Sequence, residues 1–185
     1  MAVRIVRAAA RWQIECLTLF AFASANWRRA RSEVRSIFTL AEDVLDDLSA
    51  ACVDQSVRVC VLGRTDRLPS RLVGGLERLT RETSSGKRTL RIALDYSSRD
   101  AIVAAARGLR VGDDRAAFER RLTGGVPPVD LLIRTGGEQR LSDFLLYECA
   151  FAELHFSPRL WPDFDEAALA EAFAWFGRRQ RRFGG

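Results

Sequence analysis

The fold is decided by residues 129–156, VDLLIRTGGEQRLSDFLLYECAFAELHF. This stretch opens with a short apolar run at 129–133 and closes with ELHF at 153–156, where polar and apolar residues alternate as in a short strand. The apolar segment between them, 143–152, is typical of a helix that follows a polar loop. A strand, a helix and another strand in this order predict two parallel strands joined by a crossover.

The same alternation extends over the rest of the chain. Further strands are expected at 17–22, 57–62 and 89–96. Helices are expected at 2–13, 34–48, 72–79 with Ser70 as its cap, 99–109 and 165–182, and the Gly/Pro/Asp-rich connection 110–128 has room for one short helix. This pattern predicts an α/β single domain over residues 1–185, in which a parallel sheet carries helices on both faces.

Composition narrows the class of protein. A length of 185 residues suits one domain, and no apolar run reaches the ~20 residues of a membrane-spanning helix. Arginines interrupt the N-terminal apolar run, which argues against a secretion signal. The four scattered cysteines and the single histidine make zinc or disulfide scaffolds improbable, so reduced thiols are expected. The net charge of +5 comes with no nucleic-acid-binding module, so no nucleic-acid partner is inferred.

Polar stretches follow three of the expected strands. They are ASANWRR after 17–22, SSRD after 89–96 and RTGGEQRLS after 129–133. Because the carboxyl ends of parallel strands meet at one edge of a sheet, these stretches are expected to converge on a ligand site.

The stretch RTGGEQRLS has the residue types of a diphosphate-binding loop. Arg134 and Arg140 offer planar donor forks, and Gly136 and Gly137 would let backbone N–H groups approach an anion. Ser142 stands where a helix is expected to begin. The residue types leave a plain alternative open, in which the arginines pair with acidic side chains of the loop.

The other two candidate groups also have two readings. Asn26 and Arg29 could reach the shared site, with Trp27 lining an apolar channel, or Trp27 could belong to the core beside a solvated helix entry. Glu153, at the start of the last strand, needs a cationic partner, and either an arginine or Mg²⁺ would serve. His155, the only histidine, is expected to be structural.

The text of residues 130–164, DLLIRTGGEQRLSDFLLYECAFAELHFSPRLWPDF, resembles the long signature of the cis-prenyltransferases, typified by bacterial undecaprenyl diphosphate synthase. Similar text falls in the family's order at 17–34, 58–63, 68–72, 90–103 and, for the C-terminal basic segment RRQRRFGG, at 178–185. The resemblance implies condensation of isopentenyl diphosphate with an allylic diphosphate, with Mg²⁺ as cofactor. It also implies a cytoplasmic homodimer, or a heteromer with a homologue, with peripheral membrane contact.

The resemblance also implies roles for individual residues. Isopentenyl diphosphate would be held by Arg134, Arg140, Leu141 and Ser142; Ser24, Trp27 and Arg29 would line the substrate site; Asn26 would assist proton removal; and Glu153 would coordinate Mg²⁺.

Three departures from the family pattern bear on activity. The first family strand, which ends in Asp-Gly-Asn-Gly-Arg-Trp and supplies a catalytic Asp and a phosphate loop, has no counterpart in this text. Ala23 and Ala25 replace a serine and an acidic residue, and the family's Asn-Tyr-Gly-Gly-Arg becomes DYSSR at 95–99. Two hypotheses follow from the resemblance, an active enzyme of which this chain is a part, or a non-catalytic homologue or partner subunit that binds isopentenyl diphosphate.

Overall fold

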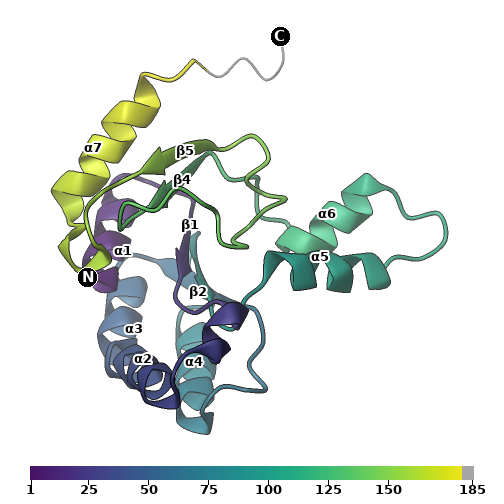
Figure 1. Ribbon diagram of the computed structural model, residues 1–185, viewed down its shortest axis with the longest axis horizontal. Coiled ribbons are helices and arrows are strands. Elements are labelled where there is room, and N and C mark those ends of the chain that lie inside the picture. Colours follow the sequence, from purple (N-terminus) through teal and green to yellow (C-terminus); the bar gives the residue numbers. More distant parts are fainter. Residues whose placement is uncertain (181–185) are drawn as a thin grey trace. The chain divides into compact units, whose positions relative to one another are not determined.

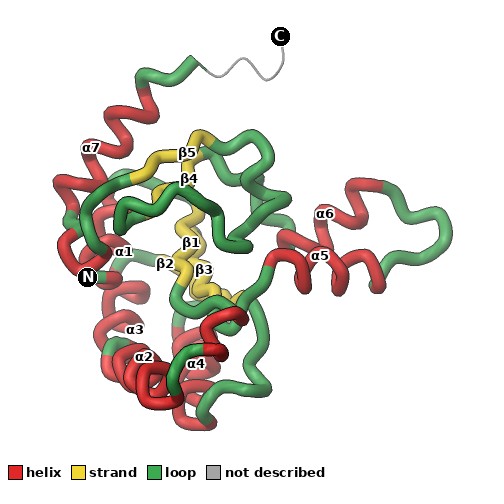
Figure 2. Tube along the Cα trace, in the orientation of Figure 1, coloured by secondary structure: helices red, strands yellow, loops and turns green. Residues whose placement is uncertain are grey.

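The computed structural model describes residues 1–180, which form two compact units, one covering Ala2–Ser97 and one beginning at Ser98. Parallel strands and helices alternate along both of them, as Figures 1 and 2 show. The expected α/β class with parallel pairing is therefore confirmed. The strands are divided between a three-stranded and a two-stranded sheet.

The first unit is built on three parallel strands in the order β1 (Cys16–Phe20), β3 (Arg88–Ala93) and β2 (Val57–Leu62). Their carboxyl ends finish in line, because Phe20 pairs with Ala93 and Ala93 with Leu62. The apolar run predicted as a buried strand is half-buried as β1, because β1 lies at the edge of this sheet.

Four helices complete this unit. They are α1 (Ala2–Arg11), α2 (Arg31–Asp43), α3 (Leu45–Asp54) and α4 (Ser70–Glu82), and a short 3-10 turn, η1, spans Ser24–Arg28. Helices α3 and α4 contact β2, and α1 packs on α3. Successive side chains of a strand point to opposite faces, so Leu17, Leu90 and Val59 lie on one face of the sheet. That face joins one apolar core with residues of all four helices, such as Val6 and Leu72.

The second unit begins with a helical hairpin, α5 (Ser98–Arg107) against α6 (Arg115–Thr123). Its two parallel strands are β4 (Leu131–Arg134) and β5 (Glu153–Phe156), and after the turn η2 (Trp161–Asp163) comes α7 (Glu166–Gly177). Both α6 and α7 start at an aspartate cap: Asp114 accepts from the N–H of Ala117, and Asp165 from that of Ala168.

The predicted helix over 143–152 is wrong, because this segment forms turns. Ser142, Asp143 and Leu145 have φ of 51°, 64° and 44°, in the left-handed region that no right-handed helix uses. Some backbone groups of the segment form turn bonds within it, such as the Cys149 N–H to the Leu145 carbonyl, and others bond to other parts of the unit. The N–H of Leu146 donates to Ser98 Oγ at 2.9 Å, and the carbonyl of Glu148 accepts from another segment.

Other elements differ from the prediction mainly at their ends. The prediction that Ser70 caps its helix is wrong, because Pro69 holds the cap position and Ser70 is the first helical residue. The stripe 34–48 is divided between α2 and α3 at Val44. The strand expected at 89–96 ends at Ala93, and the last helix ends at Gly177. Residues 181–185 of the basic segment RRQRRFGG lie outside the described residues.

Two glycines of the first unit should respond oppositely to alanine. A Cβ on Gly63 (φ 100°) would lie 2.1 Å from the carbonyl oxygen of Leu94, whereas one on Gly74, at an exposed position of α4, would meet nothing within 4 Å. The backbone conformation alone should make Gly63→Ala cost about 1–3 kcal/mol of unfolding free energy. Gly74→Ala should raise the free energy of unfolding by about 0.5–1 kcal/mol. Urea unfolding of both variants measures this; equal shifts would contradict the close approach at Gly63.

The cysteines behave as the sequence predicts. All four are free thiols, with Cys52 and Cys149 buried. Burial raises the pKa of both thiols to about 11, which keeps them protonated and unreactive. In the described part of the chain, no helix has the length and apolar character needed to cross a membrane.

Candidate functional site

The turn η1 follows β1 directly and presents three of the predicted site residues, Ser24, Asn26 and Trp27. The N–H of Asn26 donates to the carbonyl of Ala23 at 2.8 Å, and the side-chain oxygen of Asn26 accepts from the N–H of Ala23 at 2.9 Å. These two reciprocal bonds close the turn. Asn26 is therefore held in one orientation, with its amide nitrogen left to act as a donor.

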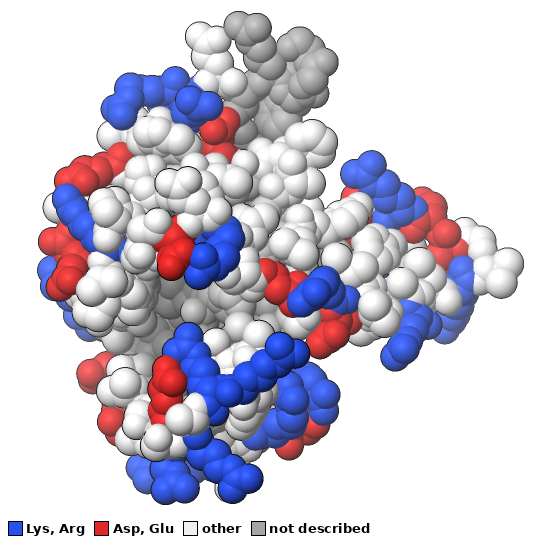
Figure 3. Space-filling view, in the orientation of Figure 1, with Lys and Arg blue, Asp and Glu red and all other residues white. Residues whose placement is uncertain are grey.

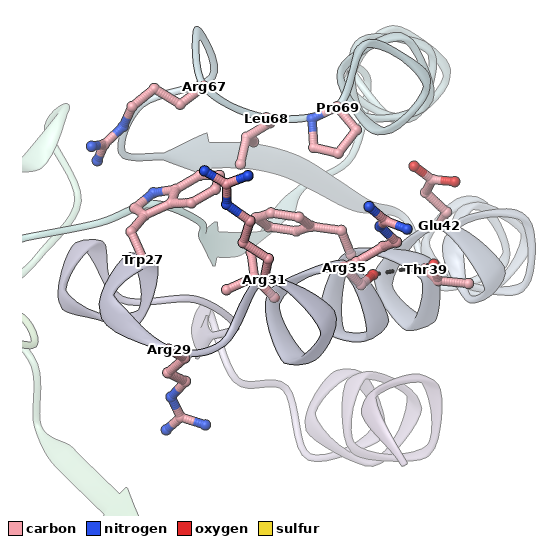
Figure 4. A pocket seen from close by; sticks show the side chains of 11 residues that line it. Trp27, Arg29, Arg31, Arg35, Thr39, Glu42, Arg67, Leu68 and Pro69 are labelled. Atoms are coloured by element: carbon pink, nitrogen blue, oxygen red, sulfur yellow. Dashed lines mark hydrogen bonds between the residues drawn. The ribbon is translucent and has the colours of Figure 1, made fainter.

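Trp27 belongs to an aromatic cluster and also to a pocket wall. Its ring lies 5.3 Å from that of Phe22 in an edge-to-face arrangement and 5.4 Å from that of Phe38. The pocket, between α2 and residues 67–69, holds about 600 Å³, within the range of small-molecule sites. Both readings of Trp27 are thus partly met, because it packs on the core and lines a cavity (Figure 4).

Arginines surround the apolar part of this pocket. Arg31, Arg35 and Arg67 line it together with Val34 and Phe38. Arg29 also borders the pocket, but its guanidinium pairs with Glu33 one helical turn on, and Figure 4 shows it pointing away from Trp27. Of the predicted pair, Trp27 is the one that faces the cavity.

The second predicted group lies at the carboxyl end of β4, in residues 134–142 (the β4 loop). Nη1 of Arg134 donates to Ser142 Oγ at 2.7 Å and also to the carbonyl of Arg140. Within residues 1–180 these are its only hydrogen bonds, so Nε and Nη2 keep three N–H donors for a ligand. Because Ser142 Oγ accepts the hydrogen bond from Arg134, its own hydroxyl proton is left to donate to a ligand. The structure therefore brings Arg134 and Ser142 together with hydrogen-bond donors to spare, and Leu141 lies between Arg140 and Ser142 in the same loop.

Two details of this loop differ from the prediction. The N–H groups of Gly136 and Gly137 do not face an open site, since they donate to the carbonyls of Arg159 (2.7 Å) and Ser157 (2.9 Å). Their glycine requirement comes from φ of 89° and 77°. Arg140 is exposed and pairs with Glu138, as the plain alternative proposed.

Two residues of α5 that carried no predicted role, Ser98 and Arg99, hold this loop. Arg99 Nε lies 3.3 Å from Asp143 Oδ1, and the Arg99 N–H donates to the same oxygen at 3.1 Å. The N–H of Ser98 donates to the Asp143 carbonyl at 3.0 Å. Ser98 and Arg99 thus fix the residue that follows Ser142. The sequence signal that could have identified these two residues was their place in SSRD, directly after an expected strand.

Glu153 does not lie with Arg134. In the parallel pair β4–β5, Glu153 is opposite Leu131 and Arg134 is opposite Phe156, so the two residues lie at opposite ends of the strands, about 10 Å apart along them. Their places in the alternation also put them on opposite faces. Glu153 accepts from Arg179 Nε at 2.9 Å, which is the arginine alternative of the prediction. His155 packs on Trp175 at 5.0 Å, as a structural histidine does.

Charge on the visible face is mixed. Acidic side chains lie among the basic ones, as Figure 3 shows. Many arginines form ion pairs with neighbours in their own unit, such as Arg115 with Glu119 and Arg159 with Glu171. The positive net charge therefore does not form one continuous surface on this face.

Comparisons with known proteins bear on the whole chain. The model of the prenyltransferase family described as undecaprenyl diphosphate synthase matches residues 1–184. The chain belongs to this family. The resemblance to this family seen in the sequence is therefore confirmed.

Individual relatives agree with this assignment. Isoprenyl transferase 1 of Bradyrhizobium diazoefficiens is 49% identical over 98% of this chain and 76% of its own length. Ditrans,polycis-undecaprenyl-diphosphate synthase of Francisella tularensis is 42% identical over 92% of this chain and 71% of its own length. The structure of lavandulyl diphosphate synthase from Lavandula x intermedia, in complex with dimethylallyl diphosphate, matches with a TM-score of 0.94 and 33% identity, covering 100% of this chain and 85% of that one.

Proposed function

We propose that the protein is a cis-prenyltransferase, which condenses isopentenyl diphosphate with an allylic prenyl diphosphate to give a cis-polyprenyl diphosphate. Membership of the undecaprenyl diphosphate synthase family supports the reaction class. The observation that carries the assignment to this chain is the Arg134–Ser142 pair, whose remaining donors suit a diphosphate. A solved relative that contains dimethylallyl diphosphate, an allylic diphosphate, supports the second substrate.

The reaction needs anion binding and a way to lose a proton. The allylic C–O bond breaks and its electron pair leaves with the diphosphate. The π electrons of the isopentenyl double bond form the new C–C bond, and loss of a proton restores a double bond. In this scheme Arg134, Arg140, Leu141 and Ser142 hold the isopentenyl diphosphate, while Ser24, Trp27 and Arg29 line the substrate site.

Asn26 can assist proton removal only as a hydrogen-bond donor. Because its side-chain oxygen already accepts the Ala23 N–H, it presents an N–H donor to a ligand. A donor can orient a diphosphate oxygen or a water that takes the proton, but it cannot take the proton itself. We therefore assign Asn26 to orienting the acceptor.

We propose Mg²⁺ as the cofactor because the family generally depends on it, and Glu153 is the residue expected to bind it. The described residues do not fit a metal site at the β4 loop, because Glu153 lies at the other end of the strands and pairs with Arg179. Among residues 1–180 no cluster of three or more metal-ligating side chains occurs. We therefore assign no step of the reaction to a metal held by these residues.

The family also suggests where and in what form the protein works. We propose a single cis-prenyltransferase domain over residues 1–185 that acts in the cytoplasm as a homodimer, or with a homologous subunit, and contacts the membrane peripherally. The free thiols suit a reducing compartment.

Incubation of the purified protein with labelled isopentenyl diphosphate, farnesyl diphosphate and Mg²⁺ tests the proposal. A labelled product that extracts into organic solvent is expected. Absence of product from folded protein, together with calorimetric binding of isopentenyl diphosphate, would favour the non-catalytic homologue instead. Absence of both product and binding would overturn the function proposed for the β4 loop.

A further inference from the structure

A buried carboxylate follows β3 in the first unit. The side chain of Asp95 is fully shielded from solvent, and its backbone has φ of 47°. An ionised carboxylate in such a place is unfavourable unless it is paired and hydrogen-bonded. Arg67 supplies the pairing with both arms of its guanidinium, Nε to Oδ2 at 2.7 Å and Nη2 to Oδ1 at 2.5 Å. This two-point geometry fixes the Arg67 side chain as well as neutralising Asp95.

The same carboxylate reaches the turn η1. Ser24 Oγ lies 2.9 Å from Oδ1 of Asp95 and 3.0 Å from its carbonyl oxygen, and its single proton can serve either. The Ser24 N–H donates to the carbonyl of Tyr96 at 2.9 Å. The start of the turn that carries Asn26 is therefore attached to the segment just after β3.

Of the two partners of Asp95, Arg67 also lines the pocket, beside Trp27. The guanidinium carbon of Arg67 lies 5.4 Å from the centre of the Trp27 ring, within the range of a cation–π interaction. Figure 4 shows these two side chains at the same end of the pocket. The close approach of Gly63 to Leu94 and Asp95 brings the segment 63–69 near enough for Arg67 to make these contacts.

We propose that Asp95 is a positioning residue which, through Arg67 and Ser24, sets the Asn26–Trp27 turn for prenyl transfer. This inference rests on the proposed function. A purely structural carboxylate would need only neutralisation, whereas Asp95 holds one side chain of the pocket and the start of the turn. Ionisation of the carboxylate suits this role. Burial raises the pKa of Asp95, but the hydrogen bonds from Arg67 and Ser24 and the charge of Arg67 lower it by more, so the net pKa lies below its usual range.

The test is a double-mutant cycle of Asp95→Asn and Arg67→Gln. Asparagine is nearly isosteric, so the fold should persist while the ion pair is lost. Each single change should lower kcat/KM about tenfold, and the double variant should be no worse than the poorer single, because the two side chains act as one unit. Asp66→Asn is the control: Asp66 is exposed and pairs with Arg64 in the same segment. Additive losses, or Asp95→Asn with unchanged kcat and KM, would overturn the proposal.

A second measurement does not depend on turnover. The fluorescence emission of Trp27 is obtained as a difference: each protein is measured with Trp27 and again with the added change Trp27→Phe, and the second spectrum is subtracted from the first. Asp95→Asn should shift that emission and make it more accessible to acrylamide, whereas Asp66→Asn should leave it unchanged. If the parent protein forms no product, the proposed function fails but this comparison still stands. Trp27 emission that is identical in Asp95→Asn and the parent would show that Asp95 does not position the turn.

Discussion

Replacing Arg134 by alanine is expected to lower kcat/KM for isopentenyl diphosphate by about 100-fold or more. Two N–H bonds of Arg134 hold its own loop, and the three remaining donors form the fork that we assign to the diphosphate. Loss of one preorganised donor group at a site of developing or bound negative charge commonly costs this much. The side chain is only half-buried and its two bonds stay within its own loop, so the fold should be little affected.

The measurement is steady-state kinetics with the isopentenyl diphosphate concentration varied, alongside calorimetric binding. Arg134→Lys should recover only part of the loss, because lysine keeps the charge but not the fork. Arg120→Ala removes the same charge from an exposed position of α6 and should stay within about twofold of the parent. If Arg134→Ala stayed within threefold of the parent while binding isopentenyl diphosphate normally, the assignment of this loop would be wrong.

Most of the fold follows from local patterns in the sequence. The strands at 57–62 and 153–156 have the bounds that the sequence predicts, because apolar residues recur at every second position in both segments, as they do in a strand. Periodicity also predicts α4 and α5 well. Local pattern was sufficient where the backbone bonds stay within an element or its direct neighbours.

The segment 143–152 shows where local pattern is insufficient. Its apolar residues have a helical spacing, but its N–H and carbonyl groups bond to Ser98 and to other distant partners. Those bonds depend on tertiary arrangement, which overrides a weak propensity. The left-handed conformations at Ser142 and Asp143 are equally unpredictable, because neither position carries glycine.

The candidate site was predictable in its residue types and less so in its geometry. Arg134 and Ser142 are paired as a diphosphate loop requires, although that role stays a prediction. Register separates Glu153 from them, and only the pairing of β4 with β5 reveals this. The Arg67–Asp95 pair was missed because its members are 28 residues apart and the sequence shows Asp95 only as a departure from the family's Asn-Tyr-Gly-Gly-Arg, with nothing that links it to Arg67.

Replacing Phe22 by alanine should lower the free energy of unfolding by about 3–5 kcal/mol, the usual cost of removing a buried aromatic ring. Phe22 is 1% exposed, and its ring lies 4.8 Å from that of Phe38 and 5.3 Å from that of Trp27. Its backbone also joins the sheet, because the Phe22 N–H donates to Ala93 and its carbonyl accepts from Tyr96. The substitution leaves these backbone bonds in place, so the loss reports on ring packing.

Urea unfolding followed by circular dichroism measures this effect, and Phe151→Ala is the matched control. Phe151 is 70% exposed, so its removal should change stability by no more than about 0.5 kcal/mol. Phe22→Leu should lose less than Phe22→Ala, since leucine fills part of the space. Because Trp27 packs on Phe22, its emission should shift in Phe22→Ala even where the protein remains folded. A Phe22→Ala variant as stable as Phe151→Ala would show that the aromatic cluster does not anchor the turn to the core.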